Sequence, residues 1–150
     1  MGAASAKVSG SVDETEAAAA DLSKQLKAGD LIHVCGDVGA GKTTFIRGAC
    51  RGLGFEGAVT SPSYTICNRY EDGELLISHL DCQRLEGATG EETGLLDDEI
   101  GPNRITFIEW PQQSVGAVGS LALAAPAVRV DLGHISPYQR SVTIDWLRAL

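Results

Sequence analysis

The residues best suited to chemistry stand in one short stretch, Gly36–Thr43, which has the sequence GDVGAGKT. It fits the pattern G-x-x-x-x-G-K-T, typical of the P-loops that bind nucleotide phosphates. The glycines allow the backbone to curl until successive N–H groups point inward at an anion. In such a loop Lys42 would reach the β- and γ-phosphates, and the hydroxyl of Thr43 would bind Mg²⁺. The residues expected to contact the nucleotide are Gly36, Asp37, Gly39, Ala40, Gly41, Lys42, Thr43 and Thr44.

The segments on either side of the loop support this prediction. Leu31–Cys35 is a short apolar run that indicates a buried strand. Residues 44–53 place Phe45, Ala49 and Leu53 on one face of a helix. A helix that begins at the loop adds the positive end of its dipole to the phosphate site. We therefore predict a nucleotide site in this loop.

Two carboxylates are placed to serve the same site. A P-loop needs an acidic group at the carboxyl end of a neighbouring strand, where it holds Mg²⁺ or its water. Asp81 and Glu109 each follow an apolar, strand-like run, at 74–80 and 104–108. Because Glu109 follows the cleaner run, we expect it to bind the metal, and Asp81 to position water or sense the γ-phosphate. With Lys42 they are the candidate catalytic residues; the alternative for each carboxylate is a solvated group at a strand end.

The composition narrows the possible functions. A chain of 150 residues is long enough for one domain with a proper core, which we place at 1–150. Its 12 basic and 20 acidic residues leave a net charge of −8, so we expect no unaided binding of nucleic acid or anionic membrane. The four cysteines include no C-x-x-C pair, which favours reduced thiols in a cytoplasmic protein over a zinc site. Residues 1–10 lack an apolar segment, so we expect a loose tail there.

The pattern along the chain predicts few helices after residue 53. Ser11 and Glu14 form a capping box, which predicts a helix that continues to about Lys27. The other expected elements are an extended loop at 58–66 that leads into an edge strand, a charged turn at 68–73, the two strands before Asp81 and Glu109, and an antiparallel pair at 128–132 and 141–146 joined by a loop at 133–140. The predicted fold class is α/β, a P-loop NTPase-like three-layer fold with a mixed, partly antiparallel sheet.

Four blocks of sequence together resemble the TsaE (YjeE) family, the small ATPase of tRNA threonylcarbamoyladenosine biosynthesis. The first block is the P-loop with the glycines that follow it, Gly36–Gly48 and Gly52–Gly54. The others are Thr60–Thr65 (family S-P-T-[FY]-T), His79–Leu85 (H-F-D-L-Y-R-L) and Ile108–Pro111 (I-E-W-P). The resemblance covers about residues 11 to 145. It departs from the family at Leu80, Cys82 and Gln83, which replace Phe, Leu and Tyr, while His79, Asp81 and Arg84 are intact.

The resemblance implies that the chain binds ATP and Mg²⁺, with Thr43 and Glu109 as metal ligands and Asp81 near the phosphate. It also implies that Thr15 lies near the nucleotide and that Arg140 matches a basic residue of the final hairpin. The residues alone would favour a neutral, solvated position for Thr15. The implied partners are protein subunits of a tRNA threonylcarbamoyl transferase complex, with no direct tRNA binding by the isolated chain.

Trp110 and His79 lie close in sequence to the two carboxylates. Trp110 follows Glu109, and either a core position or an aromatic contact with the nucleotide or a partner fits it. We expect His79 to pack or to form hydrogen bonds, because no second histidine or cysteine at metal spacing accompanies it.

Two other functions compete with an ATPase of this family. A small P-loop kinase that phosphorylates a metabolite would share the loop, but 85–103 contains no arginine for a lid. A nucleotide-sensing subunit without turnover would also share it. A GTPase is disfavoured, because the chain contains no N-K-x-D segment to read guanine.

Overall fold

A seven-stranded sheet supports the helices in the part of the chain that the computed structural model describes, residues 4–37, 39–60, 67–72, 75–81, 101–109 and 125–149. The elements in chain order are β1 (Ala4–Ser9), α1 (Val12–Ser23), β2 (Leu31–Cys35), α2 (Lys42–Gly52), β3 (Cys67–Asp72), β4 (Leu75–Asp81), β5 (Arg104–Glu109), β6 (Val128–Ser136) and β7 (Gln139–Trp146).

The sheet is parallel at its centre and antiparallel at both sides. Its strand order is β1-β7-β6-β2-β5-β4-β3, in which β6, β2, β5 and β4 run parallel to one another. β7 pairs antiparallel with both β6 and β1, and β3 pairs antiparallel with β4. β2, β4 and β5 are nearly continuous apolar runs with mostly buried residues, as strands inside a parallel sheet require. The predicted α/β class and mixed, partly antiparallel sheet are confirmed.

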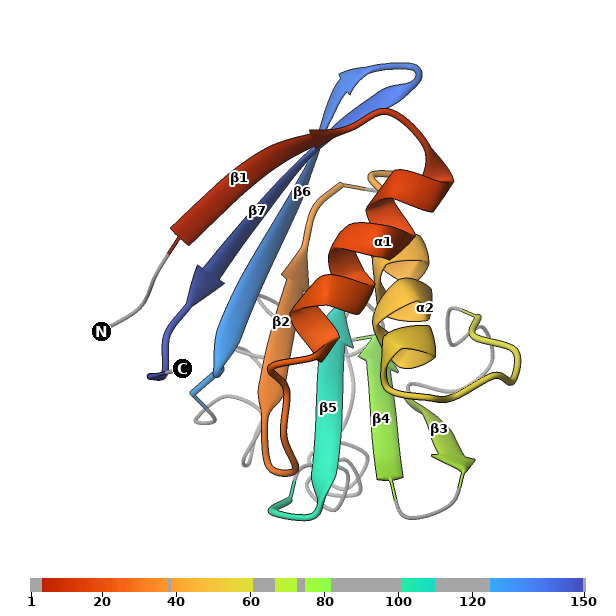
Figure 1. Ribbon diagram of the computed structural model, residues 1–150, viewed down its shortest axis with the longest axis vertical. Helices are drawn as coiled ribbons and strands as arrows, with labels where there is room; N and C mark the ends of the chain where they lie inside the picture. The colour runs from red at the N-terminus through yellow and green to blue at the C-terminus, as the bar shows by residue number, and fades with distance from the viewer. Residues whose placement is uncertain are drawn as a thin grey trace, which may run out of the picture.

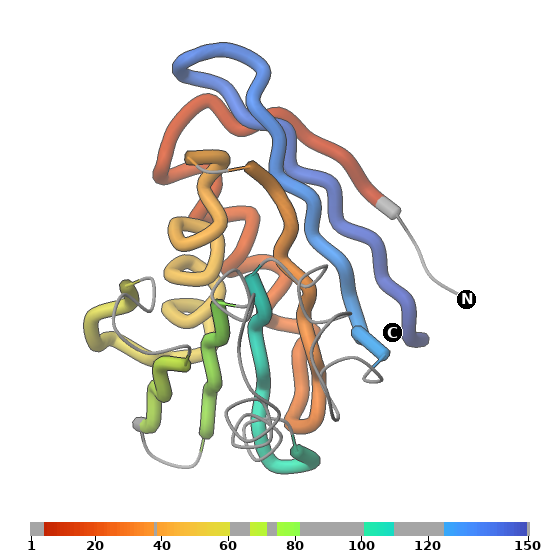
Figure 2. The backbone as a smooth tube through the Cα atoms, turned by 180° about the vertical axis from the view of Figure 1, so that it is seen from behind, coloured from red at the N-terminus to blue at the C-terminus, as the bar shows by residue number. Residues whose placement is uncertain are grey.

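Both described helices cover the same face of the sheet, with α1 and α2 side by side over β2, β5 and β4 (Figures 1 and 2). α2 lays Phe45, Ile46 and Ala49 against Ile32 and Phe107 of the strands, and all five are fully buried. The described residues include no helix on the opposite face of the sheet, where the third layer of the expected fold would lie. No helix in the described ranges has the length and apolar character needed to cross a membrane.

Two glycines of α2 let the helices approach closely. A Cβ on Gly48 would lie 2.5 Å from Cα of Glu16 and 2.8 Å from its carbonyl carbon. A Cβ on Gly52 would lie 2.9 Å from Cα of Ala20. Since real Cβ contacts below 3.0 Å essentially never occur, only glycine fits at either position. The two helix N-termini therefore lie close together at one end of the sheet (Figure 1).

The expectation of a loose tail at 1–10 is wrong for residues 4–9, which form the edge strand β1. Each of these residues has a partner on β7, from Ala4 opposite Asp145 to Ser9 opposite Arg140. The sequence ASAKVS carries little apolar signal, and the unpaired edge of β7 supplies the hydrogen bonds that order it.

The expected charged turn at 68–73 is also wrong, because Cys67–Asp72 forms β3. In an edge strand one face is solvated, so polar side chains alternate with a buried one. Here Tyr70 is buried, whereas Arg69 and Glu71 are exposed. Residues 61–66, in the extended loop that was expected to precede an edge strand, lie outside the described residues.

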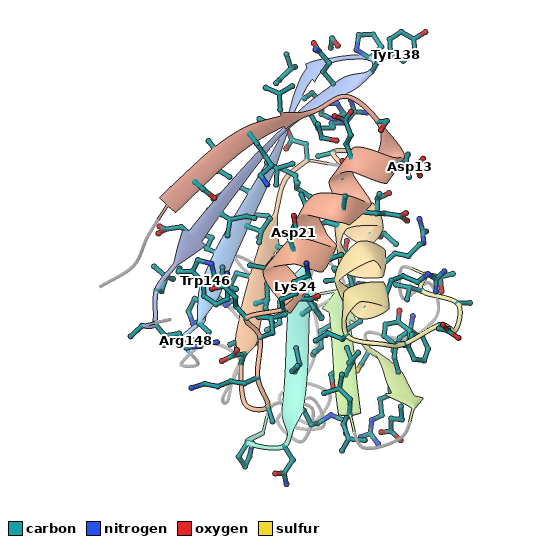
Figure 3. The ribbon with its side chains drawn as sticks, viewed as in Figure 1. Asp13, Asp21, Lys24, Tyr138, Trp146 and Arg148 are labelled. Carbon is teal, nitrogen blue, oxygen red and sulfur yellow. The ribbon has the colours of Figure 1, made fainter. Side chains whose placement is uncertain are left out.

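Two boundaries differ from the prediction. α1 ends at Ser23 instead of Lys27, because the backbone N–H groups of residues 24–26 each bond three residues back, which tightens the last turn. The antiparallel pair of β6 and β7 is confirmed, but its connection is only the two residues between Ser136 and Gln139. The expected loop at 133–140 is therefore mostly strand. Figure 3 shows Tyr138 at the tip of this hairpin, at the opposite end from Trp146 and Arg148.

Candidate nucleotide site

The glycine loop connects the carboxyl end of β2 to the N-terminus of α2, as the sequence predicted. Gly36, Gly39 and Gly41 have φ values of 151°, 79° and 102°, which side-chain-bearing residues rarely adopt. At Gly36 a Cβ would also lie 2.6 Å from the carbonyl oxygen of Leu132 on β6. The loop thus curls tightly against β6, and Gly41 caps α2 in a left-handed conformation. A helix N-terminus that opens from such a loop is suited to bind an anion.

Lys42 lies inside this loop, with its residue only 6 % exposed. Its ammonium donates hydrogen bonds to the carbonyl oxygens of Gly36, at 2.7 Å, and Asp37, at 2.9 Å. Burial lowers the pKa of Lys42, and the negative charges of Glu109, Asp81 and Asp37 oppose that shift. The structure therefore brings the loop lysine and the two predicted carboxylates within electrostatic range of one another.

Asp81 and Glu109 end neighbouring strands and are paired in register across β4 and β5. Both are buried, at 6 % and 3 % exposure. The hydroxyl of Thr43 donates to Oε1 of Glu109 at 3.4 Å, across 66 residues of sequence. Hard oxygen donors, a hydroxyl and a carboxylate, are what Mg²⁺ takes from P-loop proteins, and phosphates complete its shell. The donor set at this point fits that ion.

The other carboxylate oxygen of Glu109, Oε2, forms a hydrogen bond with His79. Nε2 of His79 lies 2.7 Å from Oε2 of Glu109, and Nδ1 lies 2.9 Å from the hydroxyl of Tyr70. His79 is fully buried. The expectation that His79 packs and forms hydrogen bonds is confirmed.

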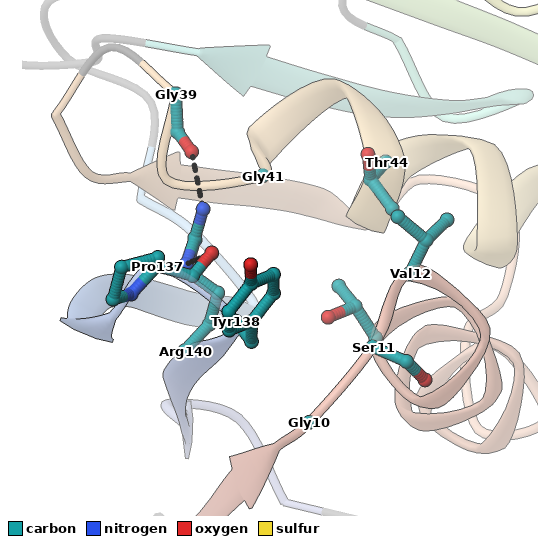
Figure 4. Close-up of a pocket in the computed structure, with 10 residues that line it drawn as sticks. Gly10, Ser11, Val12, Gly39, Gly41, Thr44, Pro137, Tyr138 and Arg140 are labelled. Carbon is teal, nitrogen blue, oxygen red and sulfur yellow. Dashed lines mark hydrogen bonds between the residues drawn. The ribbon is translucent and has the colours of Figure 1, made fainter.

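A cavity of about 420 Å³ opens beside the glycine loop (Figure 4). This volume is within the range of sites for small ligands. One wall comes from the loop and α2, another from the start of α1, and a third from the tip of the β6–β7 hairpin. The lining residues are Gly10, Ser11, Val12, Thr15, Gly39, Gly41, Thr44, Pro137, Tyr138 and Arg140.

Thr15 and Arg140 both line this cavity. The solvated position that the residues alone favoured for Thr15 is wrong: it is 3 % exposed, and its hydroxyl lies 2.6 Å from that of Ser9. Arg140 extends from the hairpin, and its guanidinium donates to the carbonyl oxygen of Gly39 at 3.4 Å (Figure 4). Arg140 therefore ties the hairpin to the glycine loop, 101 residues away in sequence.

The start of α1 is built by the predicted capping residues. The Ser11 hydroxyl accepts from the N–H of Glu14 at 3.1 Å. The Glu14 carboxylate accepts from the N–H of Gly10 at 2.8 Å, one residue before the expected partner. This reciprocal pair holds the turn that forms one wall of the cavity.

The sequence analysis did not identify two residues of the site, Tyr138 and Tyr70. Tyr138 is 82 % exposed at a hairpin tip, in a stretch that was interpreted as loop. Tyr70 fell in the expected turn at 68–73. Neither carries a local signal, because both reach the site through strand pairing. Of the expected site region, Val38, residues 61–66, Arg84 and Trp110 lie outside the described residues.

The fold and the glycine loop define a P-loop protein of the nucleotide-binding class. Residues 9–142 match the family described as threonylcarbamoyl adenosine biosynthesis protein TsaE. The chain belongs to this family, as its four sequence blocks predicted.

Three relatives named tRNA threonylcarbamoyladenosine biosynthesis protein TsaE illustrate the similarity. The chain is 37 % identical to the Streptomyces coelicolor protein over 131 residues, which cover 84 % of this chain and 86 % of that one. It is 40 % identical to the Synechocystis protein over 95 residues, 61 % of this chain and 60 % of the relative. It is also 40 % identical to the Bacillus subtilis protein over 98 residues, 65 % and 61 % of the two chains. The last two matches thus span about three-fifths of those relatives.

A solved structure has the same fold. The crystal structure of Bacillus subtilis YdiB superimposes with a TM-score of 0.73 at 26 % identity, covering 99 % of this chain and 88 % of YdiB.

Proposed function

We propose that the chain binds and hydrolyses Mg·ATP in the cytoplasm, as a subunit of the machinery that makes tRNA threonylcarbamoyladenosine. The observation that carries this proposal is the convergence of Lys42, Thr43, Asp81 and Glu109 at one edge of the sheet, beside a cavity of about 420 Å³. Membership of the TsaE family supports a role for this activity in the modification of tRNA.

The glycine loop and the N-terminus of α2 would cradle the phosphates through backbone N–H groups. Lys42 would exchange the carbonyl oxygens of Gly36 and Asp37 for phosphate oxygens, which are stronger partners for an ammonium. Mg²⁺, held by Thr43 and Glu109, would neutralise charge on the phosphates. Asp81 would accept a hydrogen bond from the attacking water and orient it towards the γ-phosphate.

The cavity beside the loop would hold the nucleoside part of ATP. Thr15 and Thr44 offer hydroxyl groups, Arg140 offers a guanidinium, and the ring of Tyr138 forms one side. This mixture of an aromatic surface and a few polar groups is typical of sites for small molecules.

The proposed partners are protein subunits of the threonylcarbamoyl transferase complex, and the charge of the chain supports this. Its net charge of −8 repels RNA. Four arginines are already paired with carboxylates: Arg47 with Glu16, Arg104 with Glu71, Arg129 with Asp131 and Arg148 with Asp30. Tight RNA binding needs several cations on phosphates, which these pairs would have to give up.

Calorimetric titration with Mg·ATP tests the nucleotide site. Lys42→Ala should weaken binding by on the order of 2–4 kcal/mol, because it removes a charge-assisted contact. Lys24→Ala is the matched control, because it removes an exposed lysine at the end of α1. It should bind Mg·ATP as the wild type does. Equal affinity of the wild type and Lys42→Ala would refute the proposed site.

Turnover and capture experiments test the remaining steps. Phosphate release from ATP separates an ATPase from a subunit that only senses nucleotide, and a screen of small-molecule acceptors separates it from a kinase. A pull-down of the transferase subunits in ATP and in ADP tests the coupling to partners. We expect capture to depend on the nucleotide, since the γ-phosphate would lie among the loop, Asp81 and Glu109.

A further inference from the structure

A hydrogen-bonded series of polar groups leads to Glu109 across three adjacent strands, and its members on the strands are buried. The carbonyl oxygen of Thr60 lies 3.0 Å from the hydroxyl of Tyr70 on β3. That hydroxyl lies 2.9 Å from Nδ1 of His79 on β4, and Nε2 of His79 lies 2.7 Å from Oε2 of Glu109 on β5. Tyr70 is 5 % exposed, His79 0 % and Glu109 3 %. Water therefore has little access to the contacts that His79 makes with Tyr70 and Glu109.

The proposed metal site requires Glu109 as a carboxylate, which only accepts hydrogen bonds, so Nε2 of His79 is the donor to Oε2 of Glu109. The hydroxyl of Tyr70 contacts Nδ1, the other ring nitrogen, which prevents the imidazole from turning. The rings of Phe55 and Tyr70 pack with their centroids 5.1 Å apart, and those of Tyr70 and His79 at 5.9 Å. The imidazole is thus fixed by packing as well as by its hydrogen bonds.

We propose that His79 and Tyr70 are positioning residues for the Mg²⁺ site, acting through Glu109. They hold one carboxylate oxygen, so that the other, Oε1, faces the hydroxyl of Thr43 and is presented to the ion. This inference rests on the proposed function, in which Glu109 and Thr43 hold Mg²⁺.

The carboxylate of Glu109 needs this restraint because its terminal torsion can rotate. The terminal torsion of a glutamate has broad minima, so an unrestrained Glu109 could present either oxygen in many directions. The charge of Lys42 also interacts with Glu109, and an unrestrained carboxylate could turn towards the ammonium that the phosphates require. Groups that hydrogen-bond to a metal ligand typically contribute about 10- to 100-fold to metal affinity. β3, an edge strand with a polar sequence, places the hydroxyl of Tyr70 against His79.

The test compares two substitutions that keep different halves of the imidazole. His79→Asn retains a polar group near Nδ1 and loses the contact with Glu109. His79→Gln retains an amide near Nε2 and can still donate to Oε2. For each variant, ATP affinity is measured by calorimetry in Mg²⁺ and in EDTA, and the ratio of the two affinities reports the contribution of the metal. A general loss of stability lowers both affinities and leaves their ratio unchanged.

We expect His79→Asn to lower this ratio by about 10- to 100-fold, and His79→Gln to retain most of it. Tyr70→Phe keeps the ring that packs on Phe55 and removes only the hydroxyl, so we expect a smaller decrease of about two- to tenfold. If His79→Asn does not fold, Tyr70→Phe decides: a lowered ratio supports the inference and an unchanged ratio overturns it.

Two results distinguish failure of this inference from failure of the proposed function. A wild type that gains affinity from Mg²⁺, with the same gain in His79→Asn and Tyr70→Phe, would overturn the positioning role alone. A wild type that binds no ATP would overturn the proposed function and the positioning role with it.

Discussion

Replacing Gly48 by alanine tests whether close packing of α1 on α2 builds the nucleotide site. The new Cβ would lie 2.5 Å from Cα of Glu16 and 2.8 Å from its carbonyl carbon, and it would also contact the carbonyl oxygen. All three are backbone atoms, so no side-chain rotation can relieve the overlap. Ordinary contacts begin at about 3.4 Å, and α1 would have to move by roughly 1 Å.

Two effects of opposite sign set the stability of Gly48→Ala. Forcing an extra carbon into a packed interface costs about 1–3 kcal/mol, and the backbone overlap places this case at the upper end. Alanine is better than glycine inside a helix by about 1 kcal/mol. The net destabilisation is then about 2 kcal/mol, which corresponds to a decrease in Tm of about 4–8 °C for a chain of this size.

The assay is thermal unfolding followed by circular dichroism, with ATP affinity as a second measurement. Displacement of α1 would carry Thr15 away from Thr44, and both line the cavity, so affinity should decrease as well. Gly101→Ala is the matched control, because a Cβ there meets no atom within 4 Å. It should be neutral or slightly stabilising. A Tm of Gly48→Ala equal to or above that of the wild type would refute the reasoning, since helix propensity would then outweigh the interface.

The remaining predictions concern the carboxylates, the thiols and RNA. Glu109→Ala should raise the Mg²⁺ concentration needed for nucleotide binding, whereas Asp81→Ala should spare binding and suppress turnover; the opposite pattern in calorimetry and phosphate release would exchange their roles. Burial raises the pKa of the Cys50 thiol to about 12, so iodoacetamide at pH 8 should label half-buried Cys67 and leave Cys50 unmodified until urea unfolds the chain, which peptide mass mapping would show. In a gel-shift titration at physiological salt the isolated chain should not bind tRNA, and tight, salt-sensitive binding would contradict the proposed route through protein partners.

The contiguous parts of the site could be predicted from the residues alone. A P-loop is contiguous: its glycines set the backbone path, and its lysine and threonine side chains stand at fixed places on that path, so eight residues specify the site. The positions of Asp81 and Glu109 followed from two apolar runs, because parallel strands that end on an acidic residue bring those residues to one edge of the sheet. The pairing of β4 with β5 in the structure agrees with that reasoning.

Which weakly patterned segments join the sheet and the cavity depends on contacts between elements that are distant in sequence. β1 and β3 have sequences that predict a tail and a turn, and they become strands because neighbouring strands offer unpaired hydrogen-bonding groups. Packing of α1 on α2 buries Thr15. Strand pairing brings Arg140 to Gly39 and Tyr70 to His79. Such contacts leave no periodic signal, because side-chain periodicity reports which face of an element is buried and carries no information about the element that covers it.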